Sequence, residues 1–143
     1  HGPPLQVVEG VRLGDDGVFE AHLVARPAEA LRPGAGAWRV PAPLIDGVLQ
    51  ACGRGAVLHL GLDTPCLPRG FARLDLGRAP RPDERCRALI RLARVDGRDL
   101  AFDFDVFGDD DALLVHATGY QAICLAPAAS DAPATKKAAR GDA

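Results

Sequence analysis

One carboxylate in an apolar segment is the strongest candidate for chemistry in this chain. Within residues 39–53, Asp46 and Gln50 are four residues apart, so a helix places both on one face. Apolar residues recur at helical spacing on the opposite face: Leu44, Ile45, Val48, Leu49 and Cys52. We expect Asp46 in the first turn, where the helix dipole favours its anion, whereas burial favours its protonated form. Such a carboxyl group suits proton donation. The alternatives are an acid that only stabilises the helix and a solvated Gln50.

The elements that position this segment follow from the residue pattern. Pro41 and Pro43 suit the first turn of a helix, and Gly53 and Gly55 are expected to end it. Alternating apolar residues predict strands at 5–13, 18–25, 71–76, 86–95, 100–107 and 113–125. Residues 14–17 and Asp96-Gly97 predict tight turns, the latter a type I′ hairpin. Two strands, one helix and about four more strands predict an α+β hotdog fold, an antiparallel sheet wrapped around one helix.

Composition limits the classes of function. The 143 residues suit one domain, and 48% hydrophobic content is ordinary for a soluble protein. A formal net charge of -2 gives no reason to expect nucleic acid or a membrane as partner. No run is apolar enough to span a bilayer and no signal peptide pattern is present, so we expect a cytoplasmic protein. The start at His1 without Met predicts that the sequence is a piece of a longer chain. Residues 128–143 are predicted to form a flexible linker or tail.

Other reactive residue types give weaker signals. The four cysteines are scattered and are expected as reduced, partly buried thiols, with Cys52 in the core. His22, His59 and His116 lack the spacing of a metal site, and residues 109–111 lack the spacing of a calcium-binding EF-hand. Three arginines at alternate strand positions predict a solvated face, with a protein-docking patch as the alternative: Arg85, Arg87 and Arg91.

Several short segments together resemble the dehydratase domains of polyketide synthases. They are HGPPLQ at residues 1–6, PLIDGVLQA at 43–51, LPRGF at 67–71 and VDGR at 95–98. They occur in the family's order, and the resemblance extends over residues 1–127. The D-x-x-x-Q pattern after a proline is the specific part.

The resemblance implies one half of a double hotdog. In that family a first unit carries a His in an H-x-x-x-G-x-x-x-x-P motif, and a second unit carries the Asp. None of the four histidines fits this motif; at His59 the required Gly is replaced by Asp63. Residues 1–127 are therefore expected to be the C-terminal hotdog subdomain, paired with an N-terminal half upstream in a dimeric synthase. An unpaired sheet edge would also favour pairing with a second hotdog unit.

By the same resemblance, the reaction is dehydration of a 3-hydroxyacyl chain carried on the phosphopantetheine of an acyl carrier protein. Asp46 would act as general acid, Gln50 would orient it, and the His of the other half would act as base. No metal or organic cofactor is expected. Candidate acyl-lining residues are Pro43, Leu44, Leu67, Pro68 and Phe71, and His1 stands where many members have Tyr. A related cyclase, a double-bond-shifting isomerase and a catalytically silent hotdog unit are the alternatives.

Overall fold

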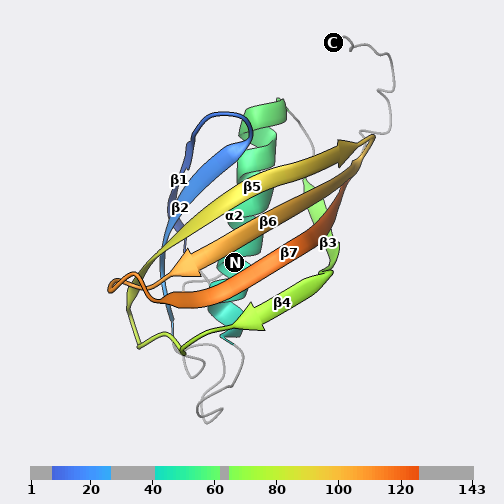
Figure 1. Ribbon diagram of the computed structural model, residues 1–143. Coiled ribbons are helices and arrows are strands. Elements are labelled where there is room, and N and C mark those ends of the chain that lie inside the picture. The colour runs from blue at the N-terminus through green and yellow to red at the C-terminus, as the bar shows by residue number, and fades with distance from the viewer. Residues whose placement is uncertain (1–7, 27–40, 62–64, 126–143) are drawn as a thin grey trace.

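A single antiparallel sheet curves around one long helix (Figure 1). The computed structural model describes residues 8–26, 41–61 and 65–125. Within these ranges the elements are β1 (Val8–Leu13), β2 (Val18–Val24), α2 (Ala42–Leu60), β3 (Cys66–Gly70), β4 (Arg73–Leu76), β5 (Arg85–Asp96), β6 (Asp99–Phe107) and β7 (Leu113–Cys124). The strand order is β1-β2-β5-β6-β7-β3, and β4 also pairs with β7. The predicted sheet around one helix is therefore confirmed, whereas the tail at 128–143 lies outside the described residues.

The core forms where the alternating strand residues meet the apolar face of α2. Strand β6 directs Leu100, Phe102, Phe104 and Val106 inward, and each is at most 2% exposed. Strand β2 contributes Phe19, Ala21 and Leu23 in the same way. The helix contributes Leu44, Val48 and Cys52, all 1% exposed or less. The apolar side chains repeat every two residues along the strands and every 3.6 residues along the helix, and together they form one buried layer between the sheet and the helix.

The helix is longer than the sequence pattern predicts. It continues through Gly53 and Gly55 to Leu60 and ends at Gly61, which adopts the left-handed conformation with φ of 68°. The prediction of a stop at Gly53 and Gly55 is wrong because both glycines have helical neighbours that continue the hydrogen-bonding pattern. Gly55 instead provides room for a close contact with the ring of Phe19 on β2. No helix in the described part of the chain is long and apolar enough to cross a membrane.

The segment expected to break the chain at 67–70 is a strand. Strand β3 pairs with the end of β7, and β4 begins only at Arg73 rather than at residue 71. Pro68 is compatible with β3 because the strand lies at the edge of the sheet, where a missing backbone N–H removes no bond to an inner neighbour. The hairpin at Asp96-Gly97 is confirmed in position. Its loop, however, is Gly97-Arg98, with positive φ only at Gly97, which is typical of type II′ rather than I′.

The outer face of the sheet carries arginines on β5 that lie close to carboxylates. Arg85, Arg87 and Arg91 extend from β5, and their guanidinium groups lie 3.3, 3.4 and 2.7 Å from Glu9, Asp111 and Asp103 respectively. Exposed pairs of this kind contribute little to stability. These arginines form the predicted solvated face, and a docking role for them stays a prediction.

Candidate active site

Asp46 and Gln50 lie together on one face of α2. The Gln50 Nε2 atom donates a hydrogen bond of 2.8 Å to Asp46 Oδ2, and both side chains are half-buried. Residues four apart in a helix are surface neighbours, so this contact follows from the D-x-x-x-Q spacing. The amide restricts rotation of the carboxyl group and orients it, which is the arrangement that a positioned proton donor needs.

The position of Asp46 in the helix corrects one prediction. Because α2 begins at Ala42, Asp46 is the fifth helical residue, and the first turn contains no acidic residue. The influence of the helix dipole falls off within the first turn. The prediction that Asp46 lies in the first turn is therefore wrong, and the Gln50 amide is one polar contact that the fold provides for its carboxyl group.

An aromatic cluster on the neighbouring strands adjoins this site. Tyr120 on β7 is 3% exposed, and its ring lies 5.2 Å from that of Phe71 and 5.8 Å from that of Phe102. Burial raises the pKa of the Tyr120 hydroxyl well above its usual value, and the nearby Cys52, Cys66 and Asp46 add to this effect. Tyr120 therefore stays neutral and lies within electrostatic range of the Asp46 carboxyl group.

A β-bulge determines that Tyr120 faces the helix. On β7, Ala117 pairs with Phe104 and Tyr120 pairs with Phe102, so three steps along β7 lie opposite two steps along β6. Gly119 has φ of 64° at this point, and its N–H donates to Asp103 Oδ1 at 3.0 Å. Without the bulge, residues 117 and 120 would face opposite sides of the sheet. Sequence reasoning missed Tyr120 for this reason, although it is the only Tyr in the chain.

The predicted acyl-lining residues occupy different environments. Pro43 and Leu44 are buried at the start of α2, and Leu44 belongs to the core. Leu67 and Pro68 are exposed on the edge strand β3. Phe71 is half-buried against Tyr120, and His1 lies outside the described residues. The structure thus brings Phe71, but not Leu67 or Pro68, into the aromatic cluster next to Asp46, and contact of all these residues with an acyl chain stays a prediction.

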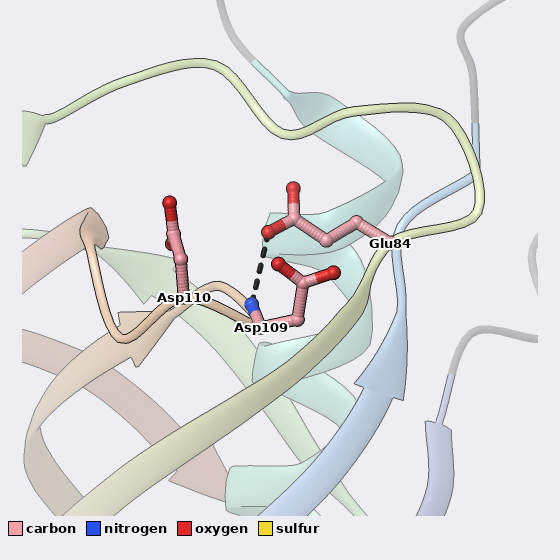
Figure 2. Close-up of side chains that lie close together, drawn as sticks. All are labelled: Glu84, Asp109 and Asp110. Atoms are coloured by element: carbon pink, nitrogen blue, oxygen red, sulfur yellow. Dashed lines mark hydrogen bonds between the residues drawn. The ribbon is translucent and has the colours of Figure 1, made fainter.

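A second polar cluster forms at the end of the sheet, around Glu84, Asp109 and Asp110. Figure 2 shows the three carboxylates together, with Asp109 N–H donating to Glu84 Oε2 at 2.9 Å. Their oxygens lie within 4.8 Å of one another, as the ligands of a cation do. The sequence gives no sign that Glu84 is buried, since it follows a Pro-rich loop rather than a strand pattern.

Two arginines supply the positive charge in this cluster. Arg78 makes two hydrogen bonds to Glu84, of 3.0 and 2.6 Å, and a third of 2.7 Å to Asp110. Arg81 pairs with both Glu84 and Asp109. The hydrogen bonds from Arg78, opposed by burial and reinforced by Arg81, hold the pKa of Glu84 far below its usual value. The cluster therefore joins the loop before β5 to the β6–β7 turn, and guanidinium groups satisfy the oxygens that a metal would need.

The thiols and imidazoles lie apart from the Asp46 carboxyl group or inside the core. Cys52 and Cys86 are buried, which raises the pKa of Cys52 and brings that of Cys86 to about 11. The core position predicted for Cys52 is confirmed. His22 and His59 are exposed, and His116 Nδ1 lies 2.5 Å from Asp105 Oδ1 on the outer face. None of these three histidines belongs to a metal-like cluster among the described residues.

A family model covers nearly the whole chain. The model described as "Polyketide synthase dehydratase N-terminal domain" matches residues 1–132. The chain belongs to this family. No curated protein sequence matches the chain.

Solved structures agree with this assignment at the level of the fold. The dehydratase domain of PpsC from Mycobacterium tuberculosis, in complex with C12:1-CoA, is 23% identical with a TM-score of 0.67, over 87% of this chain and 46% of that one. A trans-acyltransferase polyketide synthase enoyl-isomerase is 20% identical with a TM-score of 0.65, over 85% and 46%. A hypothetical thioesterase from Streptococcus pneumoniae is 16% identical with a TM-score of 0.61, over 84% and 90%. The predicted hotdog fold is thus confirmed.

The lengths of these matches show what part of a dehydratase domain the chain represents. The chain spans about half the length of the polyketide synthase structures that it matches, and most of the length of the thioesterase. It therefore corresponds to one hotdog unit. The family model is named for the N-terminal domain, whereas the D-x-x-x-Q helix led us to expect the C-terminal half, so the choice between halves stays a prediction.

Proposed function

We propose that this dehydratase-family unit supplies the general acid for dehydration of a 3-hydroxyacyl thioester. The observation that carries the proposal is the Asp46–Gln50 hydrogen bond on helix α2 of a family hotdog unit. The oriented carboxyl group would protonate the β-hydroxyl, which leaves as water. A base would take the α-proton, and the electron pair of that C–H bond would form the double bond.

The base would come from a second hotdog unit. None of the four histidines in the sequence begins the H-x-x-x-G-x-x-x-x-P motif, which supports assignment of this chain to the C-terminal half. The N-terminal half of the same dehydratase would supply that His, within a dimeric synthase. An acyl carrier protein would present the substrate on phosphopantetheine, with no further cofactor. Reading the roughly 150 residues upstream in the parent gene for the motif tests this arrangement.

The decisive experiment compares two Asp→Asn variants of the intact dehydratase, incubated with a 3-hydroxyacyl thioester mimic. Asp46→Asn removes the donated proton while keeping the shape of the side chain, so we expect loss of at least about 10²-fold in turnover. Asp16→Asn is the matched control, because Asp16 is an exposed turn residue with φ of 55°, which Asn tolerates. Water loss is followed by mass. Full turnover in Asp46→Asn with an unchanged unfolding midpoint would refute the proposal.

Isomerisation is the second candidate, because an enoyl-isomerase has the same fold at a TM-score of 0.65. The two reactions differ in mass balance. Dehydration removes one water from the 3-hydroxyacyl substrate, whereas a double-bond shift in a 2-enoyl substrate leaves the mass unchanged and moves the vinyl proton resonances. A protein that catalyses neither reaction, with either substrate, would be a silent or acyl-binding hotdog unit.

A further inference from the structure

Two of the four cysteines face each other across the edge of the sheet. Cys66 on β3 pairs directly with Cys124 on β7, and their Sγ atoms lie 2.6 Å apart. Both are free thiols in this structure. They are 58 residues apart in sequence, so only the folded sheet brings them together.

The backbone hydrogen bonds show which kind of cross-strand pair this is. Cys124 N–H donates to Arg98 O on the β6 side, at 2.8 Å, rather than to β3. The next residue, Leu125, donates to Pro65 O on the β3 side, at 3.2 Å. Cys66 and Cys124 are therefore a non-hydrogen-bonded pair, in which Cα atoms of antiparallel strands are about 4.5 Å apart and side chains approach closely. That spacing lies within the range that a disulfide spans.

We propose that Cys66 and Cys124 are a redox modification site, and that a small-molecule disulfide such as oxidised glutathione converts them to an intramolecular disulfide. This inference is independent of the dehydratase reaction. Cys66 is half-buried and Cys124 is 5% exposed, so Cys66 meets the oxidant first. Its thiolate attacks one sulfur of glutathione disulfide and releases one glutathione. The Cys124 thiolate then attacks Cys66 Sγ and releases the second glutathione. The two thiol protons of the protein are transferred to the two glutathione thiols.

The surroundings of the pair determine the pace and the consequence of this step. Burial and the neighbouring Cys124 raise the pKa of the Cys66 thiol to about 12, so the thiolate is scarce near neutral pH and the first attack is slow. The second attack is fast because the two sulfurs are already adjacent. The disulfide would tie the edge strand β3, which leads into Phe71, to β7 beside Tyr120.

The test is oxidation of the folded, reduced chain with glutathione disulfide, followed by intact mass and peptide mapping. We expect a loss of two hydrogen atoms and one cross-linked peptide pair joining Cys66 to Cys124. Cys124→Ala should instead keep one glutathione on Cys66, and Cys66→Ala should stay unmodified. Cys52 and Cys86, at 0% and 4% exposed, are internal controls that should remain thiols if the protein stays folded.

Several results would overturn the assignment. One is a wild-type chain that remains reduced while Cys124→Ala takes up glutathione. Another is a wild-type chain that retains glutathione on Cys66, because the second attack then does not occur. A cross-link that includes Cys52 or Cys86 would show that the reaction proceeds through unfolding. Circular dichroism of each variant before oxidation establishes that it is folded.

Discussion

Two glycines in helix α2 provide a sharp test of the packing, because the same substitution should have opposite effects at each. Gly53 and Gly55 are two residues apart in the helix interior. A Cβ added at Gly53 meets no atom within 4 Å, whereas one added at Gly55 lies 2.5, 2.7 and 2.8 Å from three ring atoms of Phe19. Alanine favours a helix interior over glycine by about 1 kcal/mol at either position.

The expected magnitudes follow from these contacts. Gly53→Ala should raise the free energy of unfolding by about 0.5–1 kcal/mol. At Gly55 the methyl group needs a separation of about 3.5–4 Å from ring carbons, so the ring must move by about 1 Å. Phe19 is 0% exposed, and overpacking of this kind costs about 1–3 kcal/mol. Gly55→Ala should therefore be less stable than Gly53→Ala by about 1–3 kcal/mol.

Urea unfolding followed by circular dichroism measures this difference. With a slope of about 1–3 kcal/mol per molar urea, the two midpoints should differ by about 1 M. Phe19→Leu removes part of the ring, so the penalty of Gly55→Ala should shrink in that background. If Gly55→Ala raises the midpoint as much as Gly53→Ala does, the close packing of α2 on β2 is refuted.

Three further predictions concern other parts of the sheet. Because Arg78 lowers the pKa of Glu84, the Glu84 carboxylate stabilises the fold at pH values above its ordinary pKa of 4.5, and the free energy of unfolding should fall progressively as the pH drops below 4.5. Glu84→Gln should weaken this pH dependence and lower the free energy of unfolding at neutral pH by about 3–5 kcal/mol. Urea unfolding at several pH values measures both effects. Gly119→Ala should lower the free energy of unfolding by about 1–3 kcal/mol, because φ is 64° at this residue. Gly70→Ala is the control and should change the free energy of unfolding little, because there is open space around the added methyl group. Equal losses of stability in the two variants would contradict the bulge. Closing a loop of roughly 60 residues with the Cys66–Cys124 disulfide should raise the free energy of unfolding by about 4 kcal/mol, and an unchanged urea midpoint after oxidation would contradict this.

The general outline of the fold was predictable because it depends on local periodicity. Alternation in residues 100–107 correctly assigns Leu100, Phe102 and Phe104 to the buried face, and helical spacing correctly assigns Leu44, Val48 and Cys52 to the core. The D-x-x-x-Q spacing likewise predicts that Asp46 and Gln50 share a face, because an α-helix repeats every 3.6 residues. The ends of elements were less predictable. Gly53 and Gly55 indicate a helix end, yet the helix continues because the packing of Gly55 on Phe19 outweighs the weak propensity of glycine.

The contacts that join distant segments were not predictable. Glu84 is buried only because Arg78, Arg81 and the β6–β7 turn converge on it, and no local pattern encodes that convergence. Cys66 and Cys124 meet because β3 pairs with β7, although the sequence around Pro68 indicates a break.

The period of each element, the family and the pairing of Asp46 with Gln50 can be read from the amino-acid sequence, since all of these depend on residues close together in the chain. The groups that surround that pair depend instead on contacts between distant segments of the folded sheet. The bulge at Gly119 changes the phase of β7, and a change of one residue in a strand moves every later side chain to the other face. That change turns Tyr120 toward the helix, through a backbone conformation that alternation alone does not record.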